Sequence, residues 1–108
     1  MRENRKSKKN DTASFGELWI DYSGRRIFYR NQEVVLTKTE FDIIELLSLN
    51  SGRVFDREHI YTSIWGYDGL GDSSVIAEHV RRIRGKLSRH TDREYIETVW
   101  GVGYRWIG

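Results

Sequence analysis

The fold is decided by residues 75–87, which read Val-Ile-Ala-Glu-His-Val-Arg-Arg-Ile-Arg-Gly-Lys-Leu and predict one helix with two chemically opposed faces. At about 100° per residue, one face gathers a narrow apolar stripe, which is the spacing of a helix packed on a core. The stripe consists of Ile76, Val80, Ile83 and Leu87. The opposite face carries Arg81, with Arg82 and Arg84 on its flanks. Guanidinium groups bond guanine edges or phosphates in a bidentate way, so this helix fits a nucleic-acid groove as well as a merely solvated surface.

A β-hairpin is predicted shortly after this helix, over Tyr95–Trp106. Two runs of β-branched and aromatic residues flank Gly101-Val102-Gly103, where glycines would supply the positive φ angles that a tight turn requires. A groove helix followed closely by a projecting hairpin is the pattern of a winged helix. We therefore expect a groove helix over about residues 73–88 and a wing over residues 95–107.

Three short antiparallel strands are predicted near the N-terminus, because apolar and polar residues alternate there around two pairs of turn residues. Their ranges are Phe15–Tyr22, Arg26–Arg30 and Glu33–Leu36. Residues 1–13 have almost no apolar side chains and are expected to form a flexible basic linker. Residues 14–108 are expected to form one domain, since a chain of 108 residues suffices for a single modest core.

Two further helices are predicted between these strands and the groove helix. Thr37 and Glu40 have the spacing of a capping box, which would open a helix that runs to about Leu49. Asp56 would cap a second helix that Gly66 closes. The predicted fold class is α+β: a winged helix-turn-helix with an N-terminal antiparallel sheet, three helices and a C-terminal β-hairpin.

The positive charge is concentrated in two segments, although the net charge of the whole chain is only +2. Residues 1–10 and residues 73–93 each carry a net charge of +4, whereas residues 11–72 carry −5 and residues 94–108 carry −1. The basic character of residues 73–93 is what a phosphate-binding surface requires.

Composition excludes several classes of site. The chain has no cysteine, which excludes disulfides and thiolate metal sites. No apolar run approaches the ~18 residues of a membrane span and no signal peptide is recognisable, so a cytoplasmic protein without a membrane partner is expected. The three histidines lack metal-ligand spacing, and no nucleophile elbow, P-loop or pair of carboxylates occurs. We therefore expect a non-enzyme with no metal and no cofactor.

Four motifs, in order, resemble the OmpR/PhoB-type effector domain of bacterial two-component response regulators. They are Leu36-Thr37-Lys38-Thr39-Glu40-Phe41, Trp65-Gly66, His79-Val80-Arg81-Arg82-Ile83-Arg84 and Thr98-Val99-Trp100-Gly101-Val102-Gly103-Tyr104. The resemblance spans about residues 15–107. A narrower combination of residues is similar to regulators of lantibiotic biosynthesis. It consists of Trp65-Gly66-Tyr67, Gly71-Asp72, Val75-Ile76 and Glu78-His79.

The resemblance implies sequence-specific binding of double-stranded DNA for transcriptional control. It also implies an N-terminal receiver domain, which the 108 residues leave no room for, and a sensor kinase that phosphorylates that receiver. A loop after the second helix is implied to contact RNA polymerase, with the residues Tyr67, Asp68, Leu70 and Asp72. The family forms head-to-tail pairs on direct DNA repeats. Because the chain has no heptad seam and no cysteine, we expect a monomer in free solution.

Position on the groove helix divides its polar residues into two groups. Those expected to face base edges are Ser74, Glu78 and Arg81, and those expected to clamp phosphates are Arg82 and Arg84. Glu78 would accept a hydrogen bond from a cytosine amino group, or would instead repel phosphates and orient the neighbouring arginines. Two interpretations of His79 remain open. The resemblance implies a contact with the DNA backbone, whereas its position near the apolar stripe favours a packed, hydrogen-bonded side chain.

Four further residues are DNA-binding candidates: Trp65, Thr98, Trp100 and Tyr104. Trp65 is mainly a core residue, although its indole N–H could reach a phosphate. Trp100 departs from the commoner family pattern, which has arginine at this position. An arginine can enter a narrow, electronegative minor groove, whereas a tryptophan brings an indole donor and a stacking face. Trp100 is therefore expected to pack either against sugar edges or against its own domain.

A rival interpretation from another class is a winged-helix module that binds protein and docks an acidic partner on the same arginines. Salt dependence and DNA sequence preference separate the two interpretations, since a protein dock would show no difference in affinity between duplexes. Neither interpretation assigns a catalytic residue.

Overall fold

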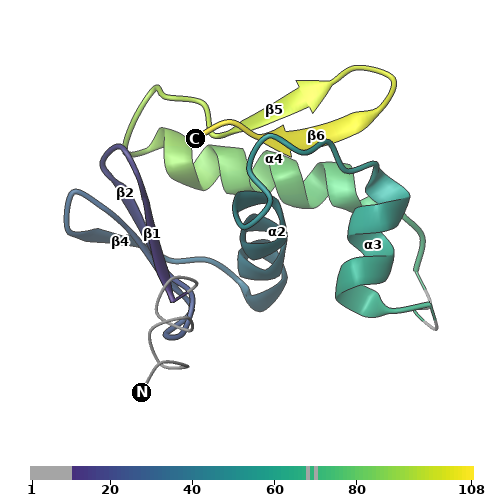
Figure 1. Ribbon diagram of the computed structural model, residues 1–108, viewed down its shortest axis with the longest axis horizontal. Helices are drawn as coiled ribbons and strands as arrows, with labels where there is room; N and C mark the ends of the chain where they lie inside the picture. The colour runs from purple at the N-terminus through teal and green to yellow at the C-terminus, as the bar shows by residue number, and fades with distance from the viewer. Residues whose placement is uncertain (1–10, 68, 70) are drawn as a thin grey trace.

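The computed structural model describes residues 11–67, 69 and 71–108. In this part of the chain an antiparallel sheet is followed by three helices and a β-hairpin (Figure 1). The sheet consists of β1 Thr12–Phe15, β2 Leu18–Asp21, β3 Arg26–Tyr29 and β4 Gln32–Val34, in that order. The helices are α2 Lys38–Ser48, α3 Arg57–Trp65 and α4 Val75–Ser88, and the hairpin joins β5 Ile96–Val99 to β6 Gly103–Trp106. The predicted α+β winged-helix architecture is confirmed.

The N-terminal sheet contains one strand more than the sequence predicts. The predicted strand Phe15–Tyr22 contains β2 but only the last residue of β1, and it runs through Gly16, where a backbone φ of 65° reverses the chain between the two strands. The linker predicted over residues 1–13 also extends too far, because Thr12 and Ala13 already pair with β2. A four-residue edge strand has too few apolar positions to produce a recognisable alternation. Residues 1–10 lie outside the described residues.

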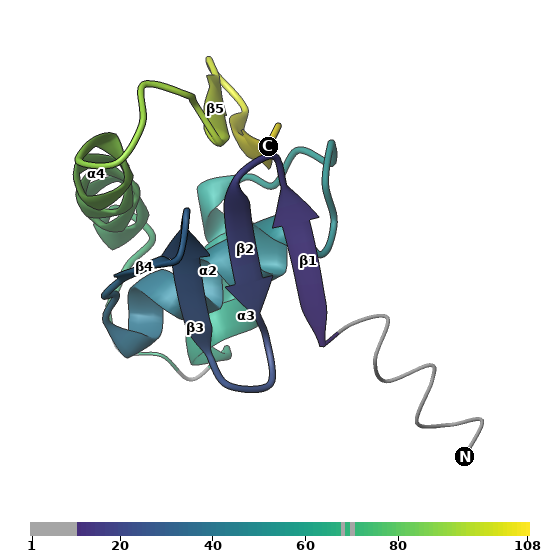
Figure 2. The ribbon, with the colours of Figure 1, turned by 90° about the vertical axis from the view of Figure 1, so that its left-hand side faces the viewer.

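The sheet covers α2, which lies behind it in Figure 2, and the two share one hydrophobic core. Buried and exposed residues alternate along β2 and β3, as a sheet covered on one face requires. The buried strand residues are Leu18, Ile20, Ile27, Tyr29 and Val34. From α2 they meet Phe41, Ile43, Ile44 and Leu47.

The predicted caps of α2 and α3 are confirmed. The hydroxyl of Thr37 accepts from the backbone N–H of Glu40 (N···O 3.2 Å), and the Glu40 carboxylate accepts from the N–H of Thr37 (2.9 Å). The Asp56 carboxylate accepts from the N–H of His59 at 2.7 Å and so begins α3. Gly66 ends α3 with a φ of 79°.

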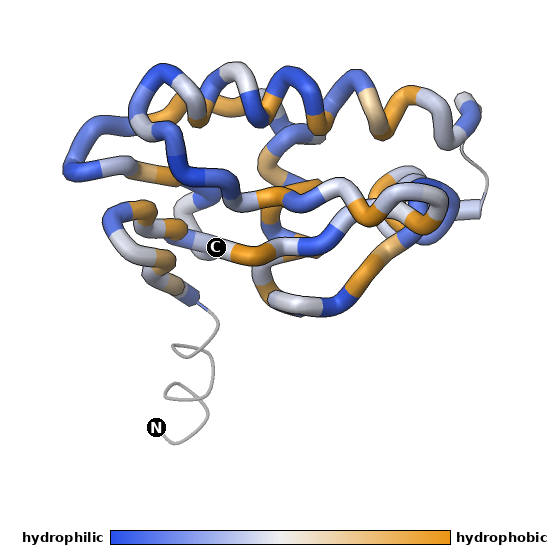
Figure 3. Tube along the Cα trace, turned by 90° about the horizontal axis from the view of Figure 1, so that it is seen from above, coloured by the Kyte–Doolittle hydropathy of each residue, from blue (hydrophilic) through white to orange (hydrophobic). Residues whose placement is uncertain are grey.

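The long helix α4 buries the predicted apolar stripe. Its four members are at most 4% exposed: Ile76, Val80, Ile83 and Leu87. Hydrophobic and hydrophilic residues recur in turn along α4 (Figure 3), which packs on α2 and α3. Burial of each such side chain contributes about 1.5–3 kcal/mol, enough to fix which face of α4 points outward. None of the described helices is long and apolar enough to cross a bilayer.

The hairpin is anchored to the segment between α2 and α3. Phe55 and Tyr104 exchange backbone hydrogen bonds of 2.8 and 2.9 Å, a pairing that the sequence did not predict. Gly101 has the expected positive φ, 80°, but the expectation is wrong for Gly103. A side chain at Gly103 would instead collide with the carbonyl oxygen of Phe55, so glycine is needed there for close approach. Trp106 is fully buried at the base of the hairpin.

Candidate nucleic-acid interface

The outer face of α4 presents two arginines that share one carboxylate. Glu78 accepts from Nε and Nη2 of Arg81 at 3.0 and 2.7 Å, and from Nε of Arg82 at 3.0 Å. The arginine side chains are 72% and 53% exposed. The hydrogen bonds from Arg81, and then those from Arg82, lower the pKa of Glu78 to about 2. These contacts are those of a carboxylate that orients its neighbouring arginines.

The first turn of α4 is held by Asp72 rather than by its own cap residue. Ser74 lies at the N-cap without a side-chain cap bond, and its N–H instead donates to Asp72 Oδ1 at 2.8 Å. The hydroxyl of Ser74 donates to the same oxygen. The side-chain bond and then the backbone bond from Ser74 lower the pKa of Asp72. Asp72, a predicted polymerase contact, therefore has a structural role at the start of α4.

The loop between α3 and α4 is otherwise fastened to α3. Tyr61 accepts from the N–H of Gly71 at 2.7 Å, and Glu58 accepts from the hydroxyl of the buried Ser73 at 2.7 Å. Tyr67, a second predicted polymerase contact, is almost fully exposed. The other two, Asp68 and Leu70, lie outside the described residues.

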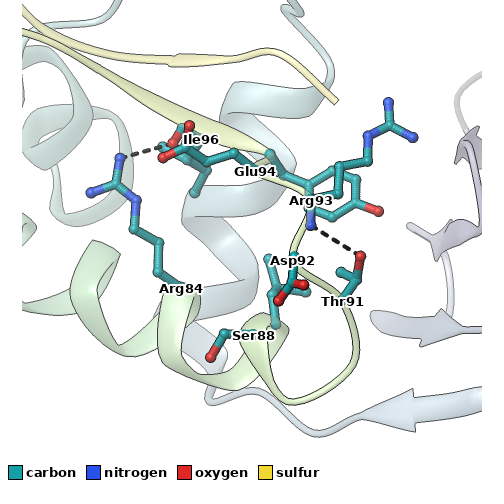
Figure 4. Close-up of a pocket in the computed structure, with 9 residues that line it drawn as sticks. Arg84, Ser88, Thr91, Asp92, Arg93, Glu94 and Ile96 are labelled. Carbon is teal, nitrogen blue, oxygen red and sulfur yellow. Dashed lines mark hydrogen bonds between the residues drawn. The ribbon is translucent and has the colours of Figure 1, made fainter.

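Arg84 is turned toward the hairpin instead of standing free on the helix flank. Its Nη2 donates to the carbonyl oxygen of Ile96 at 2.8 Å (Figure 4) and to the hydroxyl of Thr98 at 2.9 Å. The guanidinium carbon lies 5.9 Å from the ring centroid of Tyr104. Arg84 therefore already has acceptors in β5, and its phosphate contact stays a prediction. Arg84 connects α4 to the wing, which we define as β5, β6 and the turn between them.

A buried ion pair connects α4 to α2, and the sequence did not predict it. Lys86 Nζ lies 2.6 Å from Oε1 of Glu40, whose side chain is 1% exposed. Burial raises the pKa of Glu40, but the hydrogen bonds from Lys86 and Thr37 outweigh it and leave the pKa lowered. The capping box already accounts for a glutamate at position 40, so nothing in the sequence indicated a second partner for its carboxylate.

Trp65 and His79 contact each other where α3 meets α4. The Trp65 ring stacks on Tyr61 with centroids 4.7 Å apart, and its centroid is 5.9 Å from that of His79. Nδ1 of His79 lies 2.9 Å from the carbonyl oxygen of Val75. His79 therefore has the packed, hydrogen-bonded environment of one predicted alternative, while its contact with DNA stays a prediction.

The turn of the wing carries two exposed apolar side chains, Trp100 and Val102, of which Trp100 is the more exposed. Trp100, at the turn, is 88% exposed, so packing against its own domain is the wrong alternative. Thr98 is half-buried beside Arg84, and Tyr104 is half-buried against the core. The charged residues of the wing, Glu97 and Arg105, pair with each other at 2.7 Å.

Residues 31–106 match the protein family described as "Transcriptional regulatory protein, C terminal". The chain belongs to this family. The transcriptional regulatory protein SpaR of Bacillus subtilis is 37% identical over 106 residues, which cover 98% of this chain and 48% of SpaR. The chain thus spans about half the length of the curated relatives it matches.

Solved structures identify the branch of the family. The Thermotoga maritima response regulator DrrB, an OmpR/PhoB homologue, matches with a TM-score of 0.83 and 31% identity over 99% of this chain and 50% of DrrB. The Klebsiella pneumoniae RstA DNA-binding domain, solved in complex with the RstA box, matches with a TM-score of 0.74 and 33% identity over 89% of this chain and 96% of that domain. The chain is an OmpR/PhoB-type effector domain, a class that serves DNA-binding transcription regulation.

This OmpR/PhoB-type domain brings most of its predicted site residues onto one connected surface. The surface runs from the Trp65–His79 contact along the outer face of α4 and, through Arg84, to the wing. Within the described part of the chain, no group of three or more histidine, aspartate or glutamate side chains could hold a metal ion.

Proposed function

We propose that this domain binds double-stranded DNA sequence-specifically, with the outer face of α4 in the major groove and the wing near the minor groove. The observation that carries the proposal is the exposure of Arg81 and Arg82 on the side of α4 that faces away from its buried stripe. The major groove is about 12 Å wide and admits one α-helix. Hydrogen bonds from a guanidinium to the edge of a guanine are among the commonest base-specific contacts there. The similar RstA DNA-binding domain was solved in complex with the RstA box, which supports DNA as the ligand.

The proposal assigns base and phosphate contacts by position. Arg81, at the centre of the exposed face, reads a base edge together with Ser74 and Glu78, whereas Arg82 on the flank binds a phosphate. The remaining phosphate or sugar contacts are Trp65, His79, Thr98, Trp100 and Tyr104. Arg84 contributes mainly by holding the wing, because its Nη2 is already engaged by two acceptors of β5.

The partners of the proposal follow from the family. A receiver domain, phosphorylated by a sensor kinase, would control pairing of two effector domains on direct repeats. RNA polymerase would be contacted by the loop that contains Tyr67, whose side chain is exposed to solvent. The domain acts in the cytoplasm, where the bacterial chromosome lies, and needs no cofactor.

The experiment that tests the proposal selects bound sequences from a random duplex pool and then titrates selected and scrambled duplexes at several salt concentrations. We expect affinity to fall with salt and to favour the selected duplex, since each mismatched base pair costs about 1–3 kcal/mol. Arg81→Ala should reduce the preference for the selected duplex, and Arg82→Ala should weaken binding to both duplexes equally. Equal binding of all duplexes by the wild type would favour an acidic protein as the partner instead.

A further inference from the structure

The tip of the wing displays an exposed indole. Trp100 is 88% exposed, whereas the only other tryptophan more than 40% exposed among those described, Trp19, lies on the N-terminal sheet at 41%. The turn that carries Trp100 is closed by the N–H of Val102, which donates to the carbonyl of Val99 at 2.9 Å. The base of the wing is fixed by buried Trp106. The exposed indole therefore projects from a hydrogen-bonded turn on a hairpin whose base is buried.

The wing offers no unpaired charge with which to attract a phosphate. Residues 96–106 contain one acid and one base, Glu97 and Arg105, and these form an ion pair at 2.7 Å. The turn itself presents only apolar side chains, Trp100 and the half-exposed Val102. Any contact made by the tip must therefore depend on shape, apolar surface and the single indole N–H.

The tip is placed where a DNA contact would continue the face of α4. Figures 1 and 3 both place the turn of the wing toward the end of the molecule where α4 begins. Arg84 fixes the wing to α4 through Ile96 and Thr98, so the two elements present one continuous surface. With α4 in a major groove, as proposed above, the tip meets the adjoining minor groove.

We propose that Trp100 inserts its indole edge-on between the walls of the minor groove and selects A·T over G·C base pairs beneath the wing. The inference rests on the proposed function. The minor groove is about 6 Å wide, and A·T pairs present only acceptors there, which suit the indole N–H. A guanine adds its amino group to the groove floor, where it obstructs the ring and repels the donor. Apolar side chains act as minor-groove wedges in several DNA-binding proteins.

The test uses the selected duplex with the base pairs under the wing changed to A·T, I·C or G·C. Inosine·cytosine resembles G·C in the major groove but lacks the minor-groove amino group, so it isolates the minor-groove contact. We expect wild-type affinities for A·T and I·C to agree and to exceed that for G·C about tenfold, the range of one specific base-pair preference. Trp100→Ala should bind all three duplexes equally and weakly. The matched control Trp19→Ala, on the far sheet, should keep the wild-type pattern.

A charged variant separates the indole from a phosphate contact. Trp100→Arg should make the slope of log affinity against log salt concentration steeper by about one released counterion. The neutral indole of the wild type releases none. If the wild type binds A·T and G·C duplexes equally, or if Trp100→Ala retains full affinity while its circular dichroism is unchanged, the inference is overturned. In the second case the indole would serve a protein partner. Failure of the proposed function looks different, because then the wild type would show no preference for its selected duplex at all.

Discussion

The Nη2 atom of Arg84 in α4 lies 2.9 Å from the hydroxyl oxygen of Thr98 in β5, and it also donates to the carbonyl of Ile96 at 2.8 Å. Both acceptors are neutral, so the guanidinium keeps its full charge while it is held in place. One nitrogen of a planar guanidinium thus connects α4 to two acceptors of β5 at once. A lysine ammonium sits on a flexible four-carbon stem and lacks this fixed planar geometry.

The first prediction is that Arg84→Lys weakens DNA binding although it keeps the charge. The expected loss is about fivefold, the value of one hydrogen bond of about 1 kcal/mol. Thr98→Val should cause a similar loss, and the double variant should lose little more, because both changes remove the same contact. The salt dependence of binding should stay that of the wild type. Duplex titration of the four proteins at several salt concentrations measures this.

A phosphate contact would behave differently at this position. Arg84→Lys would then bind nearly as well as the wild type, and Arg84→Ala would reduce the salt slope by about one. Arg82→Lys is the matched control, since Arg82 lies on the exposed side of α4 and pairs with Glu78 there rather than with the wing. It should keep most of its affinity.

The second prediction concerns Glu78, the carboxylate between Arg81 and Arg82. Glu78→Gln removes a negative charge from a surface that faces phosphates, so binding to scrambled duplexes should strengthen and become more salt-dependent. The preference for the selected duplex should fall, because the arginines lose the acceptor that orients them. Glu45→Gln on α2 is the control and should change neither quantity. Unaltered binding of Glu78→Gln to both duplexes would contradict the orienting role.

The pH dependence of this carboxylate is part of the same prediction. The pKa of Glu78 is lowered to about 2, so the group stays ionised at every pH at which the domain is studied. Between about pH 4 and 8 the difference in affinity between wild type and Glu78→Gln should therefore be constant. A difference that falls to about half near pH 4.5 would mean that the carboxylate titrates with its ordinary pKa.

Sequence reasoning succeeded where the determining pattern is local. The stripe of α4 repeats every three or four residues, and the capping box of Thr37 and Glu40 closes within one turn, so both are visible in a short window. The contacts that assemble the site are not local. Lys86 meets Glu40 across 46 positions, and the Phe55–Tyr104 pairing joins segments on either side of two helices. No periodicity encodes such pairings, because they depend on how the finished elements pack.

The exposed and buried faces of α4 were predicted better than the directions of individual side chains. Arg81 and Arg82 occupy the exposed face because helical periodicity fixes them there once the opposite stripe is buried. Arg84 is only three residues along, but its direction is decided by acceptors in β5, which the helical pattern does not contain. Asp72 was assigned to a partner contact because the resemblance implied one for its loop, and its bond to Ser74 is a detail of backbone conformation.

The third prediction is that the Glu40–Lys86 pair stabilises the fold and orders α4. Glu40→Gln should lower the free energy of unfolding by about 1–3 kcal/mol, the range for a hydrogen bond to a charged group. Lys86→Met should cost more, because it leaves a buried carboxylate without its cation. Urea denaturation of both variants and the wild type measures the difference.

The pH profile identifies the responsible group. Because the pKa of Glu40 is lower in the folded protein than the ordinary 4.5, its contribution is fully present above that value and is lost as the pH falls through the folded pKa. The stability gap between wild type and Glu40→Gln should therefore narrow in acid. A gap of constant size from pH 7 to about pH 3 would exclude the ionised carboxylate as its source.

The fourth prediction separates two residues of the loop after α3. Tyr67→Ala should leave duplex affinity unchanged and reduce transcription in a reconstituted assay, because this exposed side chain makes no contact that positions α4. Asp72→Ala should weaken DNA binding itself, since it removes the acceptor that holds the first turn of α4, a loss of about 1 kcal/mol for a helix cap. Equal effects of the two variants on duplex affinity would contradict this division.

The fifth prediction is that the free domain is a monomer that fills direct repeats cooperatively. The described surface contains no long apolar strand edge or continuous apolar helix face left for a strong dimer interface, and its large exposed side chains are dispersed over different elements. Two domains on one duplex raise each other's effective concentration, so even a weak contact between them produces cooperative binding. For both copies of α4 to enter the same side of the duplex, half-site centres must lie about 10–10.5 bp apart.

Inserting half a helical turn between the half-sites should abolish cooperativity, and inserting a whole turn should restore part of it. Sedimentation of the free domain, combined with titration of the spaced duplexes, decides the matter: a stable free dimer, or a preference for inverted over direct repeats, would refute the head-to-tail arrangement.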